Sequence, residues 1–273
     1  MRVAYYFLIL FCLFSLSCAQ SNKKIITANG TVIEIAEMDN FIQSQMDSLE
    51  ITGLSIAVIN DGEIVYHRAV GISNLDTMEK VDNESIFEAA SLSKPVFAYF
   101  VMKMAKKGVL DLDRPLYFFY LPDSEMERDE RYKRVTARMV LDHTTGFPNW
   151  RWFDPAPKEM NIRTGDFYMK SDPGSAFGYS GEGYHCLGRV LAYLIYVNMK
   201  ELDYTFHREV STPLGMNYAY YTWDDFLYDH KVTGHKNGKT ESRCGEPDCH
   251  PTIRSRSMPH QDFIPRQSVT HSF

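Results

Sequence analysis

Two β-rich runs on either side of an Asp-Gly pair constrain the fold of this chain more than any other feature. Residues 53–59 are mostly apolar, Asn60-Asp61-Gly62 has the composition of a tight turn, and residues 63–67 continue as a second run. This pattern predicts an antiparallel β-hairpin. Because an isolated hairpin is marginally stable, the chain must cover its apolar face with further strands or helices.

Helical periodicity supplies candidates for that cover. Apolar residues recur at helical spacing between residues 31 and 48, and further helices are predicted at 91–107, 136–143 and 183–200. Gly108 follows the second of these helices, as expected where a helix ends. The sequence therefore predicts a mixture of helices with at least one antiparallel hairpin.

The size and charge of the chain narrow its class. Its 273 residues, of which 44% are hydrophobic, suit one large domain or two interlocked ones. The formal net charge is −6, and no dense Lys and Arg stripe of the kind that binds phosphate is present. We therefore expect no nucleic-acid partner.

The N-terminus has the pattern of a secretory signal peptide. Arg2 precedes an apolar run over residues 3–16, which small residues follow at 17–19. The run is too short to span a membrane comfortably. We expect residues 1–19 to direct export of the protein.

Two processing routes fit this signal. Cleavage after Ala19 would release a soluble periplasmic protein. Cleavage before Cys18, with lipid attached to its thiol, would give a membrane-anchored lipoprotein. Residues 20–29 then form a polar linker ahead of the folded domain.

The remaining cysteines predict no metal centre. Cys186 lies in an apolar helical stretch and is expected to be a buried small hydrophobe. Cys244 and Cys249 can form a local disulfide in an oxidising compartment. A metal site needs more ligands at better spacing, so we expect neither metal nor organic cofactor.

A Ser-x-x-Lys motif carries the strongest chemical signal. If Ser91 begins a helix, Lys94 lies one turn further along on the same face, and its amine reaches the serine hydroxyl. A serine needs a base to become a nucleophile, and apolar neighbours favour the neutral amine that acts as one. An N-capping serine followed by a solvated lysine would give the same four letters.

A Gly-rich segment adds a tyrosine that can complete this chemistry. Tyr179 lies within residues 173–184, where glycines are frequent. A phenol held near the serine and lysine can shuttle a proton, because a lysine favours its phenolate. An aromatic turn before a helix is the structural alternative.

These residues together resemble the serine β-lactamase-like family, which includes class C β-lactamases, D-alanyl-D-alanine carboxypeptidases and related esterases. The resemblance runs from about residue 38 to 235 and includes ordered landmarks besides the Ser-x-x-Lys motif. They are Thr136 to Pro148, which contains His-Thr-Thr-Gly at 143–146, Pro173 to Tyr184, Thr212-Pro213-Leu214-Gly215-Met216, and Thr233-Gly234-His235.

The resemblance implies a role for each candidate residue. Ser91 would attack a carbonyl carbon to form an acyl-enzyme, which water then hydrolyses. Lys94 would be the activating base and Tyr179 the second general acid/base. The backbone N–H of Ser91 would stabilise the oxyanion. The resemblance makes His143 a structural turn residue and not a catalytic base.

The resemblance also implies an α/β (α+β), β-lactamase/transpeptidase-like fold. An antiparallel sheet would be flanked by helices, with a mostly helical subdomain over residues 110–199. We expect the hydrolase domain to occupy residues 30–242 and residues 243–273 to form an irregular tail.

One departure from the family concerns substrate binding. Gly181 stands two residues after Tyr179, where the family usually has an asparagine whose amide would contact Ser91, Lys94 or the acyl amide of the substrate. The specificity loop that begins at Trp150 is rich in aromatic residues, which predicts an apolar lining. We expect Gly181 and Trp150 to take part in substrate choice.

A second departure concerns the C-terminal strands. Nothing after His235 matches the Lys-Thr-Gly or His-x-Gly strand that forms one wall of the family's site. The amino-acid composition changes near residues 243–252, and we therefore expect a truncation or a reading-frame shift there. The predicted hairpin would then lack its partner strands.

Three functional interpretations remain open at this point. The chain could hydrolyse a β-lactam, a D-alanyl peptide or a carboxylic ester through an acyl-enzyme. It could be an esterase that acts on neither peptidoglycan nor β-lactams. It could also be an inactive fragment or a non-catalytic envelope binding protein.

Overall fold

The structure is a computed structural model that describes residues 24–119, 129–222 and 225–241. The predicted signal at 1–19, Cys18, Cys244, Cys249 and the tail at 243–273 lie outside the described residues. The chain divides into two compact units, Met1–Val70 and Gly71–Phe273.

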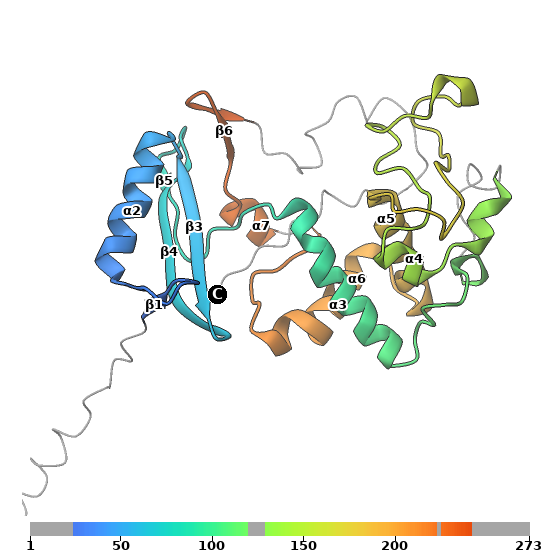
Figure 1. The fold of residues 1–273 in the computed structure, drawn as a ribbon, viewed down its shortest axis with the longest axis horizontal. Coiled ribbons are helices and arrows are strands. Elements are labelled where there is room, and N and C mark those ends of the chain that lie inside the picture. The colour runs from blue at the N-terminus through green and yellow to red at the C-terminus, as the bar shows by residue number, and fades with distance from the viewer. Residues whose placement is uncertain (1–23, 120–128, 223–224, 242–273) are drawn as a thin grey trace, which may run out of the picture. The chain divides into compact units, whose positions relative to one another are not determined.

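Strands and one helix come first along the described chain, a run of helices follows, and two short strands come last (Figure 1). In order they are β1 (Ile25–Ile26), β2 (Val32–Ile33), α2 (Ile35–Ser48), β3 (Gly53–Asn60), β4 (Glu63–Asn74), β5 (Glu79–Lys80), α3 (Ser93–Lys106), α4 (Ala137–Leu141), α5 (Gly181–Leu194), α6 (Met199–Phe206), α7 (Asp225–His230), β6 (Gly234–Lys236) and β7 (Lys239–Glu241). The division between the two units falls within β4.

The predicted hairpin is confirmed in the first unit. Asp61 and Gly62 both have positive φ angles, +50° and +78°, as the tight turns that join twisted antiparallel strands require. The sheet order is β3-β4-β5. The apolar face of α2 presents Ile42 and Met46, which are buried with Tyr66 of β4 in the core of this unit.

The structure describes only the second half of the predicted linker at 20–29, and that half contains a strand. Ile25 and Ile26 form β1, which pairs antiparallel with β2. Ile25 is buried together with Ile42, so it belongs to the core of the first unit. The helix predicted from residue 31 begins at Ile35, because Val32 and Ile33 are used in β2.

The second unit contains the larger core. α3, α5 and α6 pack together there (Figure 1). Fully buried side chains include Phe100 and Val101 of α3, Leu187 and Leu191 of α5, and Phe206 of α6. The predicted helix at 91–107 is confirmed, with a 3₁₀ turn over Ala90–Leu92 that continues directly into α3.

The helix predicted at 183–200 is two helices. α5 ends at Leu194, and Tyr196 takes a positive φ of +58°. α6 then begins with a capping box, in which the Asn198 side chain accepts from the Glu201 N–H and the Glu201 side chain accepts from the Asn198 N–H. The predicted helical subdomain at 110–199 is correspondingly less helical, since α4 and α5 are separated by a long irregular segment.

The residues just before the Gly-His landmark lie beside the segment that leads to Ser91. The Ile86 N–H donates to the His230 carbonyl at 2.8 Å, and the Val232 N–H donates to the Ile86 carbonyl at 2.8 Å. His235 Nε2 accepts from the Leu75 N–H at 3.3 Å. This pairing fixes the chain a few residues before the candidate nucleophile.

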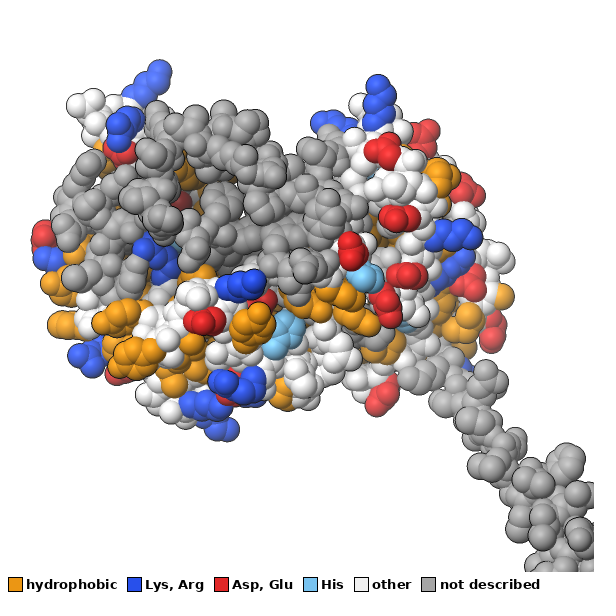
Figure 2. Space-filling model, turned by 180° about the vertical axis from the view of Figure 1, so that it is seen from behind, with side chains coloured by type: hydrophobic (Ala, Val, Ile, Leu, Met, Phe, Trp, Pro, Cys, Tyr) orange, Lys and Arg blue, Asp and Glu red, His pale blue; other side chains and the backbone are white. Residues whose placement is uncertain are grey.

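Charged side chains of both signs are interspersed on the face drawn in Figure 2, and hydrophobic side chains lie among them. Within the described residues, no helix is long and apolar enough to cross a membrane.

The buried position of Leu187 predicts a large loss of stability on truncation. Leu187→Ala should lower the free energy of unfolding by about 3–5 kcal/mol, because it removes side-chain contacts and leaves a cavity. The matched control is Leu214→Ala, since Leu214 is 55% exposed and its truncation should cost about 0.5 kcal/mol or less. Urea denaturation measures both, and equal losses would contradict the core described here.

Candidate active site

Ser91 lies in a strained turn. It is the middle residue of the 3₁₀ turn Ala90–Leu92, and its side chain is exposed. Ala90, the residue before it, has a φ of +45°, in the left-handed region that a residue with a Cβ rarely adopts. The buried Ser93 hydroxyl donates back to the Ala90 carbonyl and thereby holds this turn. Strain of this kind persists only where surrounding contacts impose it.

Lys94 lies against the candidate nucleophile. Its Nζ donates to Ser91 Oγ at 3.3 Å, across the one-turn spacing that the sequence predicts. Lys94 is only 7% exposed. The exposed serine is therefore accessible to a substrate while its lysine partner is largely shielded from water.

Tyr179 is brought to the same place from the segment just before α5. Lys94 Nζ lies 4.9 Å from the centroid of the Tyr179 ring and 5.7 Å from that of Tyr184. Tyr179 is 39% exposed, so its phenol can be reached from solvent. The structure thus brings Ser91, Lys94 and Tyr179 together.

The pKa of Tyr179 is lowered by these neighbours. Burial alone would raise this pKa, but the hydrogen bonds with Lys94 and Ser91 and the positive charge of Lys94 outweigh it. Each of these contacts favours the phenolate over the phenol. Tyr179 is therefore better able to accept a proton than an ordinary tyrosine.

His143 positions the tyrosine segment. Its backbone φ is +61°, and its Nδ1 accepts a hydrogen bond from the Ser180 N–H at 3.1 Å. The imidazole lies 4.5 Å from the Tyr179 ring and 5.2 Å from the Tyr184 ring, measured between centroids. Among the hydrogen bonds of the described residues, none joins His143 to Ser91.

The pKa of His143 is lowered by burial and by the charge of Lys94. A neutral imidazole matches the role of Nδ1 as an acceptor, since a protonated ring has no acceptor nitrogen. The geometry agrees with the structural role that the sequence analysis assigned to this turn.

Ser180 caps the helix that follows Tyr179. Its Oγ accepts from the Gly183 N–H at 2.9 Å and donates to the Pro148 carbonyl at 2.8 Å. An N-capping serine of this kind satisfies one of the N–H groups that a helix start leaves unpaired. These bonds fix the backbone immediately after Tyr179.

The two predicted substrate-binding residues contact each other. A Cβ added to Gly181 would lie 2.4 Å from the indole of Trp150, so the indole occupies the space that a side chain would need. The Gly181 N–H also donates to the Asn149 carbonyl at 2.9 Å. Glycine at this position therefore has a structural reason, which is the ring packed over it.

An ion pair that sequence reasoning missed anchors the Trp150 loop. Arg151 Nη2 lies 3.0 Å from Glu182 Oε2, and both side chains are largely buried. Removing one partner of such a pair leaves an uncompensated buried charge, which is costly. The one available signal was an arginine between two tryptophans, Trp150 and Trp152, which is an unusual place for a solvated charge.

The described residues contain no cluster of three or more His, Cys, Asp or Glu side chains that could hold a metal ion. Cys186 of α5 is half-buried.

Known proteins share the sequence pattern and the fold of this chain. A family model described as Beta-lactamase matches residues 38–252. Protein flp of Staphylococcus aureus (strain NCTC 8325 / PS 47) is 23% identical over 209 residues, which make up 73% of this chain and 41% of that protein. The chain thus spans about two fifths of the length of this curated relative.

Solved structures show the same fold. A class C beta lactamase has a TM-score of 0.61 at 19% identity, with 85% of this chain and 59% of that chain covered. EstCE1, described as a hydrolase with promiscuous acyltransferase activity, has a TM-score of 0.62 at 21% identity, with 85% and 68% covered. The predicted β-lactamase/transpeptidase-like fold is confirmed.

The contact between Gly181 and Trp150 predicts a clash on adding a single methyl group. Gly181→Ala should lower the melting temperature and change tryptophan fluorescence, because the indole must move. Gly178→Ala is the matched control, since a Cβ there meets nothing within 4 Å. Adding Trp150→Ala to Gly181→Ala should restore only part of the lost stability, because the added Cβ would still lie 2.9 Å from the Asn149 carbonyl oxygen. If Gly181→Ala is as stable as the control, the indole does not occupy this space.

The lowered pKa of Tyr179 predicts a shift when Lys94 is replaced. Lys94→Met removes the charge and the hydrogen bond that favour the phenolate, so the pKa of Tyr179 should rise and its phenolate should form at higher pH. Ultraviolet phenolate absorbance, taken as the difference from Tyr179→Phe, measures this titration. Lys200→Met, at an exposed lysine of α6, should leave it unchanged. An unchanged titration in Lys94→Met would contradict the assignment.

Proposed function

This chain belongs to the Beta-lactamase family, whose model matches residues 38–252, and on that premise we propose that it hydrolyses an amide or ester through an acyl-enzyme. The family is made up of serine hydrolases. The observation that carries the proposal is the 3.3 Å hydrogen bond between Lys94 Nζ and Ser91 Oγ, with Tyr179 beside both.

Acylation begins with loss of the Ser91 proton. The Lys94 and Tyr179 pair accepts this proton as Ser91 Oγ bonds to the carbonyl carbon. The carbonyl electron pair moves to oxygen and forms the tetrahedral intermediate. When the intermediate collapses, the bond to the leaving group breaks, and the leaving group takes a proton from the Tyr179 phenol.

Deacylation follows the same path in reverse. A water molecule gives a proton to the lysine and tyrosine pair and attacks the acyl carbon. The ester bond to Ser91 Oγ then breaks, and the serine recovers its proton. The lowered pKa of Tyr179 supports this role, because one group must both accept and return a proton within each cycle.

The N-terminal end of α3 stabilises the negative charge that develops on the carbonyl oxygen. The Ser91 N–H lies at the first turn of the helical segment, where backbone N–H groups have no intrahelical acceptor. The positive end of the helix dipole favours an oxyanion at this place.

The contact between Trp150 and Gly181 favours an apolar acyl group. The indole covers a position where no side-chain amide is available to a substrate. Trp150 is itself partly exposed, so the ring can meet a bound acyl chain. This favours a carboxylic ester over a β-lactam or D-alanyl peptide that carries an acylamino group.

We also propose that the protein is exported, to the periplasm or to a membrane through lipid on Cys18. The signal pattern at residues 1–19 supports this localisation. A small-molecule or peptidoglycan-like substrate fits such a compartment.

Probes that acylate or phosphonylate active serines test the proposed function. A fluorophosphonate should label the folded chain, and Ser91→Ala should abolish the label because its acceptor oxygen is gone. Ser175→Ala, which removes another exposed hydroxyl, should label normally. Lys94→Met should slow labelling by about a hundredfold or more, as expected for loss of a general base.

The outcomes separate the three interpretations. Hydrolysis of a nitrophenyl ester without nitrocefin cleavage or penicillin labelling assigns ester substrates. Penicillin labelling at Ser91 assigns peptidoglycan-like ones. Folded protein that no probe labels would refute catalysis and favour a binding protein.

A further inference from the structure

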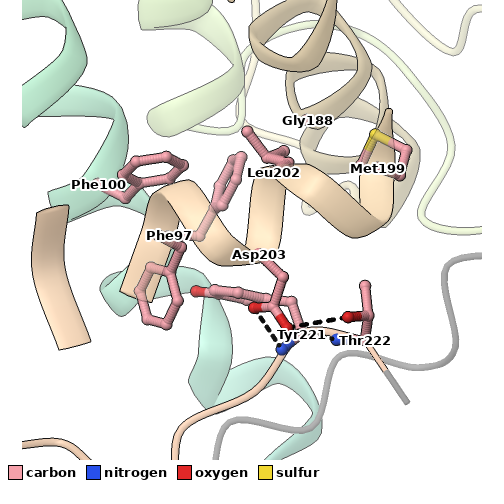
Figure 3. A pocket seen from close by; sticks show the side chains of 9 residues that line it. Phe97, Phe100, Gly188, Met199, Leu202, Asp203, Tyr221 and Thr222 are labelled. Carbon is pink, nitrogen blue, oxygen red and sulfur yellow. Dashed lines mark hydrogen bonds between the residues drawn. The ribbon is translucent and has the colours of Figure 1, made fainter. Parts of the chain in front are cut away.

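A buried carboxylate lies in the second unit, away from the residues assigned to chemistry. Asp203 of α6 is 6% exposed and borders a pocket between α3, α5 and α6 (Figure 3). The other lining residues are mostly apolar. They include Phe97 of α3, Phe206 of α6, Tyr221 and Thr222.

The carboxylate of Asp203 holds a short backbone segment. Oδ1 accepts from the Tyr221 N–H at 3.1 Å, and Oδ2 accepts from the Thr222 hydroxyl at 2.9 Å and from the Thr222 N–H at 3.4 Å (Figure 3). His207 Nε2 lies 4.0 Å from Oδ1. Burying a charge is costly unless such partners surround it, so the contacts explain why the carboxylate is tolerated here.

Tyr221 links Asp203 to the start of α3, next to the candidate nucleophile. Its hydroxyl donates to the Ser93 carbonyl at 3.3 Å. Its ring packs edge-on against Phe97 of α3 at 6.0 Å and against Phe206 of α6 at 4.7 Å, between centroids. Burial and the charge of Asp203 raise the pKa of Tyr221 well above its ordinary value, so the phenol remains a donor.

Ser93 lies between Ser91 and Lys94 and is tethered twice. Its side chain donates to the Ala90 carbonyl, and its own carbonyl accepts from Tyr221. The distance from Lys94 Nζ to Ser91 Oγ is 3.3 Å, near the upper end of the hydrogen-bond range. A small rotation of this turn would therefore separate the two groups.

We propose that Asp203 and Tyr221 are positioning residues that hold the turn of Ser91 and Lys94 in the geometry required for acylation. Asp203 fixes the backbone of Tyr221, and Tyr221 fixes the Ser93 carbonyl. This inference rests on the proposed function, because it concerns the rate at which Ser91 reacts.

A matched pair of variants tests the chain of contacts. Tyr221→Phe keeps the ring packing and removes the hydroxyl. Asp203→Asn keeps the shape, but an amide that accepts from one backbone N–H turns its NH₂ group toward the other donors. Both variants should fold, and thermal melting checks this.

The measurement is fluorophosphonate labelling of the full chain, resolved into the maximal rate constant and the half-saturating probe concentration. Tyr221→Phe should lower the maximal rate constant about three- to tenfold, as expected for one lost hydrogen bond. The half-saturating concentration and the final labelled fraction should not change. A purely structural role would lower the labelled fraction and leave the rate constant unchanged.

A double-mutant cycle tests whether Asp203 acts through Tyr221. Asp203→Asn alone should slow labelling relative to the unsubstituted chain. When Tyr221→Phe is already present, adding Asp203→Asn should slow labelling by less than about a further twofold. Tyr66→Phe is the control, because it also removes a buried phenol, which donates to Asp39 in the first unit at 2.6 Å. It should not change the maximal rate constant.

Each outcome decides the proposal. Equal rate constants in Tyr221→Phe and the unsubstituted chain would overturn it, and fully additive effects would overturn the link through Tyr221. If Asp203→Asn does not fold, Thr222→Val replaces it in the cycle. Absence of labelling in the unsubstituted folded chain would overturn the proposed function and this inference with it, whereas labelling with no Tyr221 effect overturns the inference alone.

Discussion

The left-handed backbone at Ala90 is the constraint on which the candidate site depends. A residue with a Cβ takes this conformation only when its surroundings hold it there, and here the buried Ser93 hydroxyl bonds to the Ala90 carbonyl. The turn exposes Ser91 and buries Lys94 in the same four residues. A regular helix start would not by itself expose a serine to solvent and also place beside it a lysine amine that is shielded from water.

One buried cation organises the electrostatics around this turn. Lys94 lies within 6 Å of two tyrosine rings. Its charge adds to burial in lowering the pKa of His143, and it opposes burial in lowering the pKa of Tyr179. The consequences differ, because a lowered pKa makes the tyrosine easier to ionise and keeps the histidine neutral. The same cation therefore prepares one ring for proton transfer and leaves the other as an uncharged hydrogen-bond acceptor.

Sequence reasoning found the features that depend on near neighbours. The Asp61-Gly62 turn and the spacing of Ser91 and Lys94 are local, so their geometry follows from backbone preferences. The Arg151–Glu182 pair, the indole over Gly181 and the contact of Tyr221 with Ser93 join residues far apart in the chain, and no periodicity encodes them. The separate start of α6 could have been predicted from the sequence, because Asn198 and Glu201 have the spacing of a capping box.

The indole over Gly181 limits the order in which this site can change. A larger residue at 181 is incompatible with Trp150, while loss of Trp150 alone leaves an uncovered glycine beside Tyr179. A lineage that acquires a polar side chain at 181 must therefore lose the indole first or at the same step. The two positions are expected to be epistatic, and a library that varies only one of them would miss the functional combinations.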